Sequence, residues 1–553
     1  MSKKTIPFSI PACLIHSSLG IFILWCLLIG TTLVFRPLMP IDETRYVGVA
    51  WEMWTRHDFV LPYLNGEPYS HKPPLLFWLI HLSWAVFGIN EYSARLIAPL
   101  FALATLYLSS IVAKKLWLES RYAYEITPLI LMGFFFWQVY SSLTVFDMLL
   151  TFFVLLGIHY LLILSQSLTY KNTFLLGAVI SGGLLSKGPV AFIHIIPAAL
   201  LAPWWLTNQQ KNFTWKNWYS KLFLAVFCGI ALSLLWAIPA SMEGGVVYQN
   251  EIFWGQISGR IMDSFAHKEP WWWYVTILPL AFMPWIFVVP FWYPFKPLSF
   301  QDCGVRFCIA WILPAFLTLS IISGKRLHYL LPLMPAIAML LARKISIDNK
   351  NLAQWQKTSI SILIPLAILI LALPIYLLLN NVFQWVNYLA VGNVFFIGYP
   401  FVLVLFYLHV YKLFHTQNIK QLFFVLCSII VIVPTFTAAS YFANNSQRYD
   451  TKPIAQIITQ LRSTEKEIAF YTSKYHNQFQ FTGRIKTPLT VINTSQALQS
   501  WVMAHPDGLI ITKYKNLPQE IFYFSTPYRS QQLGIIANQT LHLQPELLDK
   551  MTP

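Results

Sequence analysis

Residues 39–74 read MPIDETRYVGVAWEMWTRHDFVLPYLNGEPYSHKPP and form the longest polar interruption in the first half of a very apolar chain. This stretch contains paired acids, basic side chains, two histidines and three tyrosines. An apolar run at 19–35 precedes it, and many more apolar runs follow. We therefore expect a scaffold of membrane-spanning helices that holds this stretch at a bilayer surface.

Composition defines the class of protein. The chain has 553 residues, of which 56% are hydrophobic and 11% charged, so it is a polytopic membrane protein rather than an ordinary soluble one. Basic residues in cytoplasmic loops account for much of the formal net charge of +16, so we expect no nucleic-acid partner. The six cysteines include no pair with metal-ligand spacing, which argues against a zinc site or a disulfide framework.

We predict thirteen crossings, with a cytoplasmic N-terminus marked by Lys3 and Lys4. The run at 19–35 is interpreted as a retained first helix rather than a cleaved signal peptide. The thirteen-residue run at 75–87 is too short to span, so we expect it to lie in the interface. If it crossed, the basic loops would fall outside, against the positive-inside rule. The remaining crossings are predicted at 93–112, 125–143, 148–165, 172–186, 189–206, 221–241, 272–294, 306–323, 328–342, 358–379, 389–411 and 421–443.

Several cations remain on the predicted outer face, next to carboxylates, and this arrangement suggests an anionic ligand. Asp42 and Glu43 are either solvated loop acids or groups that orient an acceptor, take its proton or pair with a substrate ammonium. Lys72, beside Pro73 and Pro74 at a helix start, could hold a phosphate or simply extend its side chain along the membrane surface.

Asp147 and Lys187 lie at the outer ends of predicted spans, where they could form a salt bridge or share one anionic site. His71 could bind a metal ion or be an ordinary interfacial histidine. Two later segments, RIMDSFAHKEPWWWY at 260–274 and SGKRLHYLLPLMP at 323–335, place cations beside aromatic residues of the kind that border membranes.

The predicted domains are a transmembrane domain at 1–443 and a small outer α/β domain at 444–553. In the second domain, KPIAQIITQLRS and SQALQSWVMAH have helical patterns, whereas IAFYTS, LTVI and GLIITK have strand patterns.

The segments IDETRY, LNGEPYSHKPP, SKGP, AHKEPWWWY and GKRLHYLLP, in this order and spacing, resemble the bacterial aminoarabinose lipid A transferases. These enzymes group with the protein O-mannosyltransferase-like, C-type glycosyltransferases. The resemblance extends over nearly the whole chain. It implies a multi-pass bacterial inner-membrane glycosyltransferase of the C-type fold, with its active site and C-terminal domain in the periplasm.

The resemblance implies transfer of a sugar from an undecaprenyl-phosphate donor to lipid A, with resistance to polymyxin and other cationic antimicrobial peptides as the consequence. The partners are then this donor, lipid A and membrane lipids, and we expect a monomer. By motif match, catalytic roles fall on Asp42, Asp147 and Lys72, and substrate contacts on Glu43, Arg45, Tyr46, Tyr69, Lys187, His267 and Tyr329.

Two positions depart from the family pattern, in which proline commonly replaces Thr44 and glutamate commonly replaces His71. The family's glutamate lies close to a bound metal, so His71 could keep a divalent cation there. Two alternatives stay open: a transferase that uses another sugar, a protein hydroxyl or another envelope glycan, and a transporter without chemistry. Inverted repeats and mid-span acids, which are typical of transporters, are not evident in the sequence.

Overall fold

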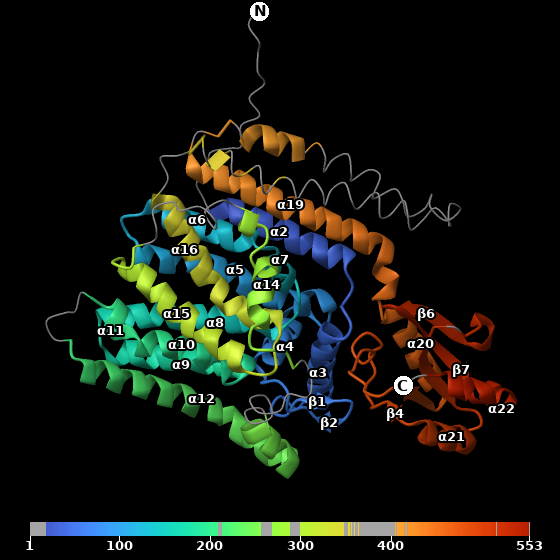
Figure 1. The fold of residues 1–553 in the computed structure, drawn as a ribbon. Helices are drawn as coiled ribbons and strands as arrows, with labels where there is room; N and C mark the ends of the chain where they lie inside the picture. Colours follow the sequence, from blue (N-terminus) through green and yellow to red (C-terminus); the bar gives the residue numbers. More distant parts are fainter. Residues whose placement is uncertain are drawn as a thin grey trace, which may run out of the picture. The chain divides into compact units, whose positions relative to one another are not determined.

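The computed structural model describes residues 18–207, 213–255, 268–287, 299–347, 418–515 and 517–551, together with scattered positions between 352 and 416. By contacts, the chain divides into two compact units. The first contains residues 1–32, 98–238 and 253–440, and the second contains residues 33–97, 239–252 and 441–553. The helices and strands of both carry the labels of Figure 1.

The first unit is helical throughout its described residues. Its helices, some of which continue into the second unit, are α2 (Ser18–Phe35), α5 (Glu91–Leu116), α6 (Arg121–Gly133), α7 (Phe135–Ser141), α8 (Phe146–Gln166), α9 (Tyr170–Lys187), α10 (Val190–Leu200), α11 (Ala202–Trp205), α12 (Trp215–Asn250), α14 (Trp273–Ala281), α15 (Cys303–Ile321), α16 (Met334–Ile347) and α19 (Ile419–Asn445). Short turns η2 (Trp285–Phe287) and η4 (Leu327–Leu333) lie between them.

Seven described helical segments are long and apolar enough to cross a membrane, which confirms a multi-pass membrane protein. The expected span at 125–143 is instead two helices, α6 and α7, separated by the extended residue Phe134. The Phe135 N–H at this break donates to the Met283 carbonyl at 3.0 Å, so a neighbouring segment satisfies the interrupted backbone. The expected span at 189–206 likewise divides into α10 and α11. Most of the spans expected at 358–379 and 389–411 lies outside the described residues.

Within the first unit, α8 packs against α9 and α10, and α10 packs against α15 (Figure 1). Small residues permit these close approaches. A Cβ at Gly177 of α9 would lie 2.9 Å from both the Ala225 carbonyl oxygen and the Cys228 Cβ of α12. Such contacts are the usual way in which helices associate where water supplies no driving force.

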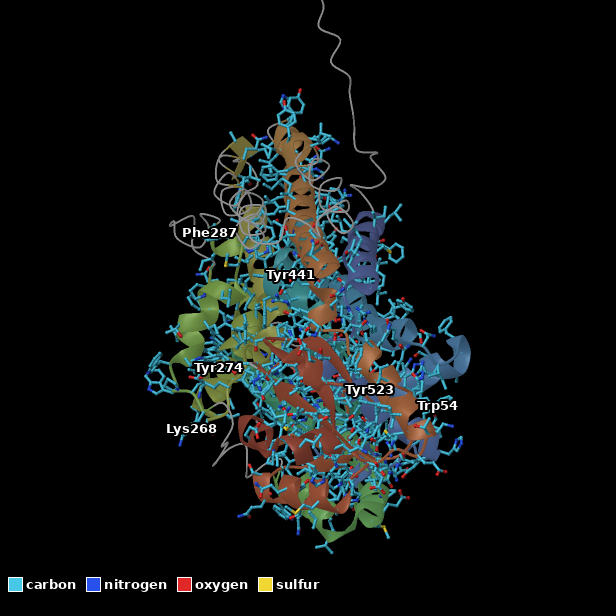
Figure 2. The ribbon with its side chains drawn as sticks, turned by 90° about the vertical axis from the view of Figure 1, so that its right-hand side faces the viewer. Trp54, Lys268, Tyr274, Phe287, Tyr441 and Tyr523 are labelled. Atoms are coloured by element: carbon cyan, nitrogen blue, oxygen red, sulfur yellow. The ribbon has the colours of Figure 1, made fainter. Side chains whose placement is uncertain are left out.

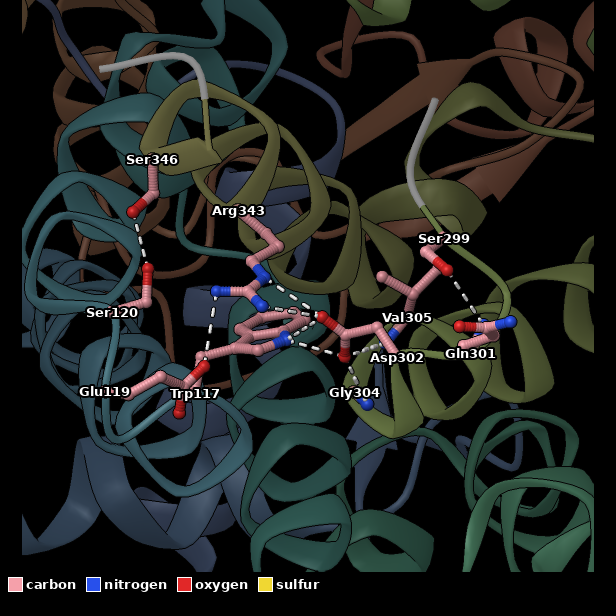
Figure 3. Close-up of polar contacts among 10 residues, drawn as sticks. All are labelled: Trp117, Glu119, Ser120, Ser299, Gln301, Asp302, Gly304, Val305, Arg343 and Ser346. Atoms are coloured by element: carbon pink, nitrogen blue, oxygen red, sulfur yellow. Dashed lines mark hydrogen bonds and ion pairs between the residues drawn. The ribbon is translucent and has the colours of Figure 1, made fainter. Parts of the chain in front are cut away.

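A polar cluster joins the C-terminal end of α5 to α15 and α16 (Figure 3). Asp302 caps α15 by accepting from the Gly304 N–H at 2.9 Å. Its carboxylate also accepts from the Trp117 indole at 2.8 Å and from the Arg343 guanidinium, with Nη2 to Oδ2 at 2.9 Å. Arg343 also pairs with Glu119 at 3.3 Å. One carboxylate thus connects three helices.

The second unit begins with α3 (Asp42–Arg56), the hairpin of β1 (Tyr63–Leu64) and β2 (Glu67–Pro68), and α4 (Leu75–Phe87). Asn65 and Gly66 occupy the hairpin turn with φ values of 54° and 88°, which is why an Asn-Gly pair stands there. Helix α4 has the bounds expected for the short run and, at 13 residues, is shorter than a spanning helix. Its interfacial position remains a prediction.

The C-terminal part is an α/β fold with the sheet order β4-β3-β5-β7-β6. The strands are β3 (Ile468–Tyr471), β4 (Thr490–Ile492), β5 (Leu509–Tyr514), β6 (Phe524–Tyr528) and β7 (Gln531–Ala537). Strands β4, β3 and β5 are parallel, and β7 and β6 are antiparallel additions. Helices α20 (Lys452–Ser463), α21 (Ser495–Ala504) and α22 (Asn538–Leu543) complete it, with turns η6 (Ser446–Arg448), η7 (Gln519–Ile521) and η8 (Pro545–Lys550). The two helices and three strands predicted here are confirmed, whereas β6 and β7 were not foreseen.

Candidate active site

An ion pair between Asp147 and Lys187 is the central feature of the candidate site in the first unit. Asp147 lies in the first turn of α8, and Lys187 is the last residue of α9. The Lys187 Nζ donates to the Asp147 Oδ1 at 2.5 Å, and the lysine and aspartate side chains are only 3% and 8% exposed. Since burying two charges is costly, their pairing is what makes burial tolerable.

Tyr329 completes this cluster from η4. The Lys187 Nζ lies 4.6 Å from the Tyr329 ring centroid, within the range of a cation–π contact. His328 packs edge-on against Tyr329, with ring centroids 4.9 Å apart, and at a tilt against Tyr140, with ring centroids 5.5 Å apart. The structure therefore brings together three residues that the resemblance placed in one site: Asp147, Lys187 and Tyr329.

Two further ionisable side chains of the first unit are buried. His194 in α10 is fully buried, and neither ring nitrogen has a hydrogen-bond partner among the described groups, which is uncommon for a buried polar side chain. A single histidine in an apolar run gave no signal in the sequence. Lys325, one of the outer cations, is buried and donates to the carbonyls of Glu269 at 2.9 Å and Ile322 at 2.6 Å. Lys325 thus holds loop backbone in place.

In the second unit, Asp42 and Arg45 form an exposed ion pair on the first turns of α3. The Asp42 side chain is 62% exposed, whereas the Arg45 side chain is 18% exposed. Burial alone would lower the pKa of Arg45, but Tyr69, Tyr46 and Asp42 outweigh burial and raise it. Arg45 therefore stays charged beside a carboxylate that solvent and ligands can reach.

His476, from the C-terminal part, lies against Arg45, with its Nδ1 3.5 Å from the Arg45 Nη1. Burial, followed by the positive charges of Arg45 and Lys474, lowers the pKa of His476 to about 4. The imidazole is neutral at pH 7 and can act there as a hydrogen-bond donor or acceptor. Its distance of 431 residues from Arg45 along the chain explains why the sequence gave no indication of it.

Glu43 differs from its neighbour Asp42. Its side chain is 1% exposed and pairs with the buried guanidinium of Arg36, whose Nη2 donates to Oε1 at 3.2 Å. The Met39 N–H also donates to the Glu43 Oε2 at 2.9 Å. These contacts fix the chain between α2 and α3, so in this structure Glu43 holds α3 in position.

Glu52 is a second buried acid of α3, and the sequence analysis did not single it out. Its carboxylate accepts from the N–H groups of Asn65 at 2.7 Å and Gly66 at 2.9 Å, and from the Asn477 side-chain amide at 2.6 Å. Burial raises the pKa of Glu52, although these three hydrogen bonds oppose the shift. Glu52 therefore ties α3 to the β1–β2 turn and to the segment that carries His476.

The remaining predicted residues of the first outer loop follow this hairpin. Tyr69 is buried, and its ring meets that of the exposed His71 edge-on at 5.4 Å. The Ser70 hydroxyl donates to the Glu251 carboxylate. Lys72 is half-buried just before α4. Tyr46, also buried, contacts Arg45, whose Nη2 lies 3.4 Å from the Tyr46 hydroxyl.

The described residues contain no group of three or more histidines, cysteines or acids that could hold a metal ion. The role of His71 as a metal ligand therefore stays a prediction. His267 lies outside the described residues, so its predicted substrate contact does too.

Comparison with protein families gives one matching model. It covers residues 71–236 and is described as dolichyl-phosphate-mannose-protein mannosyltransferase. The matched segment includes Asp147, Lys187 and His194.

Among curated proteins, the chain is 28% identical over 342 residues to undecaprenyl phosphate-alpha-4-amino-4-deoxy-L-arabinose arabinosyl transferase 2 of Pseudomonas fluorescens, covering 61% of this chain and 60% of that protein. It is 26% identical over 309 residues to the corresponding transferase of Pseudomonas aeruginosa, covering 55% of each. The chain thus matches about three fifths of the length of these relatives at most.

Among solved structures, the chain matches ArnT from Cupriavidus metallidurans bound to undecaprenyl phosphate, with a TM-score of 0.67 and 17% identity over 94% of this chain and 98% of that one. The apo form matches with a TM-score of 0.68 at the same identity, covering 94% of this chain and 97% of that one. This likeness establishes the fold. The comparisons confirm the resemblance seen in the sequence: the chain is similar to the aminoarabinose transferases and has their helical membrane fold with a small C-terminal sheet.

Proposed function

We propose that this chain is an inner-membrane glycosyltransferase that moves 4-amino-4-deoxy-L-arabinose from undecaprenyl phosphate to a phosphate of lipid A at the periplasmic face. The observation that carries the proposal is the 28% identity over 342 residues to an arabinosyl transferase of that name. The likeness in fold to a transferase with undecaprenyl phosphate bound is consistent with it.

The Asp147–Lys187 pair would meet the donor phosphate. In the transfer, the bond between the sugar C1 and the phosphate oxygen breaks, and undecaprenyl phosphate leaves with the electron pair. A lysine ammonium preorganised in a dry site stabilises the charge that develops on such a leaving group. Asp147 keeps the ammonium of Lys187 oriented and charged until the phosphate arrives. For Lys72, which belongs to the second unit, the catalytic role stays a prediction.

Asp42 would act on the sugar that is transferred. A phosphate of lipid A is already anionic, so its oxygen attacks C1 without needing a general base. Asp42 then orients the amino sugar through its ammonium or stabilises positive charge on the sugar ring. The accessible carboxylate beside Arg45, which stays charged, supports this role. Tyr46 and Tyr69 line the same cluster from α3 and the hairpin.

The product would carry an amine where lipid A had only phosphate charge. Reduced negative charge weakens the electrostatic attraction of cationic peptides to the cell surface. Resistance to polymyxin is thus the expected consequence in the cell.

A second candidate function is transfer to a protein serine or threonine. The family model that matches residues 71–236 is described as a dolichyl-phosphate-mannose-protein mannosyltransferase, and this description favours the second candidate. A neutral hydroxyl, unlike a phosphate, must lose its proton during attack, so Asp42 would then act as a general base. The size of the loss of turnover in Asp42→Asn separates these two roles.

The test is mass spectrometry of lipid A from cells that express the wild-type chain, Lys187→Met or the control Lys466→Gln, in a host lacking its own transferase. We expect the mass of one aminopentose to be added by the wild type and the control but not by Lys187→Met. Unmodified lipid A alongside glycosylated envelope proteins would point to the second candidate. Unmodified lipid A and proteins, with intact protein levels, would overturn both and favour a transporter.

A further inference from the structure

A cationic cleft lies in the C-terminal part of the second unit, and none of the residues that line it belongs to the candidate site described above. It has a volume of about 380 Å³ and is lined by polar and basic side chains: Arg448, Lys515, Arg529, Ser530, Gln531 and Gln532, with Pro527. No acid is among these lining residues. The chemistry of the cleft is that of an anion site.

The β6–β7 hairpin builds this cleft. Pro527 and Tyr528 of β6 pair with Gln532 and Gln531 of β7, so residues 529 and 530 form a two-residue turn. The Arg529 N–H donates to the Arg448 carbonyl at 2.6 Å, which fixes the turn against η6. Arg529 has a φ of 56°, a left-handed conformation that favours glycine or asparagine. The arginine adds a guanidinium group to the cleft, although its backbone conformation is less favourable than that of a glycine or asparagine would be.

The charges of the cleft are not neutralised internally. Among the described residues, Arg448, Lys515 and Arg529 form no ion pair with a carboxylate. Lys513, on neighbouring β5, has its pKa lowered by burial and then by the positive charge of Arg529. Clustered cations without counter-charges raise the local potential and attract anions.

Chain connectivity keeps the cleft close to the end of α19, a helix that is long and apolar enough to cross a membrane. Arg448 follows the last residue of α19 by three positions, a reach of about 10 Å at most. The Tyr449 hydroxyl lies 3.0 Å from that of Tyr441 in the last turn of α19, and its ring lies 5.8 Å from Phe442. Figure 2 labels Tyr441 at this helix end. Since α19 is apolar enough to span, aromatic rings at its end are of the kind that borders membranes.

We propose that this cleft binds the phosphate group of a membrane lipid headgroup. Arginine guanidinium groups match phosphate oxygens bidentately, and lysine, serine and glutamine side chains supply the remaining donors. The cleft has room for a phosphate and its glycerol. This binding is separate from the transfer reaction and would anchor the C-terminal part to the lipid surface.

The test uses the full-length protein in detergent, titrated with short-chain phosphatidylglycerol and followed by native mass spectrometry. The double variant Lys515→Gln/Arg529→Gln removes two cleft cations. Its matched control, Lys466→Gln/Lys486→Gln, removes two exposed lysines of the same domain outside the cleft. Because two cations that face an anionic group are lost, binding should weaken about thirtyfold in the cleft variant and stay unchanged in the control.

Thermal unfolding of each variant verifies that the hairpin is intact, and Arg448→Gln provides a second cleft variant that leaves the hairpin sequence unchanged. Equal phosphatidylglycerol binding by wild type, cleft variants and control would overturn the proposal. Two further probes distinguish the source of the phosphate. Phosphatidylcholine should bind more weakly than phosphatidylglycerol because its choline cation is repelled by the positive charge of the cleft. Glycerol phosphate should also bind more weakly because it has no acyl chains to hold it at the detergent micelle. Glycerol phosphate binding as tightly as the lipid would overturn the lipid assignment.

Discussion

Breaking the buried pair of Asp147 and Lys187 tests whether the cluster serves chemistry or only stability. The Lys187 and Asp147 side chains are only 3% and 8% exposed, so removing one partner leaves the charge of the other buried without a counter-charge. The uncompensated charge should destabilise the protein by about 3–5 kcal/mol. Lys187→Met and Asp147→Leu should each lower the thermal unfolding temperature. If Lys187 stabilises the leaving phosphate, Lys187→Met should also lower turnover by roughly two to three orders of magnitude.

The double variant Asp147→Leu/Lys187→Met separates the two contributions. Replacing a buried ion pair with apolar side chains of similar size is often neutral for stability, so the unfolding temperature should recover. Turnover, measured with undecaprenyl-phosphate sugar and lipid A in nanodiscs, should stay as low as in Lys187→Met. If the double variant regained both stability and turnover, the pair would be structural, and the role assigned to Lys187 would be refuted.

Three further outcomes are expected. The pKa of His476 in the folded state, about 4, lies below its ordinary value of about 6.5, so the unfolded state binds more protons between these two pH values. The free energy of unfolding should therefore fall as the pH drops from about 6.5 to about 4. Denaturant unfolding should show a less steep fall in His476→Gln. Asp302→Ala loses a helix cap and the bonds to Trp117 and Arg343, so unfolding should be easier by about 2–4 kcal/mol, whereas turnover at a permissive temperature should be unchanged. Asp42→Asn should nearly abolish turnover if the acceptor is a hydroxyl, because no base remains to take its proton, but lower turnover only in part if the acceptor is a phosphate, which attacks without a base.

The elements foreseen from the sequence are those with strong local signals. Helix α4 begins after Pro74 and ends before Gly88, and its bounds match the expected ones because both residues interrupt helices. Strand β3 is buried along its whole length and β5 begins with three buried apolar residues, as expected for the parallel part of a sheet covered on both faces. Here local sequence and tertiary structure agree.

Strands β6 and β7 were missed because each carries a residue that argues against a strand. Pro527 lies inside β6, and Gly534 lies inside β7. The sheet order explains the exception for proline, since β6 is an edge strand and an edge strand tolerates a missing N–H. For Gly534, a Cβ would come within 2.4 Å of the Phe522 ring, so close packing explains why glycine stands there.

The break between α6 and α7 shows a different limit. The sequence at 125–143 is apolar enough for one continuous span, and neither composition nor length marks residue 134 as extended. The cause is tertiary: a Cβ at Gly133 would lie 2.4 Å from the Trp285 ring, and the Met283 carbonyl takes the hydrogen bond that the helix loses at Phe135. A residue about 150 positions away thus decides where the helix ends.

The adjacent acids Asp42 and Glu43 show how much of the candidate site depends on structure. In sequence they are equivalent, and motif matching gave both a place at the substrate. Successive helix residues point about 100° apart, so one turns toward Arg36 in the protein interior and the other toward solvent. Glu43 is committed to a buried pair, whereas Asp42 keeps an accessible oxygen beside Arg45. Two carboxylates in contrasting environments can divide structural and chemical work between them. Asp42 is therefore the acid of this pair that remains available to an amino sugar or an acceptor, and α3 is held in place for it by Glu43 and Glu52.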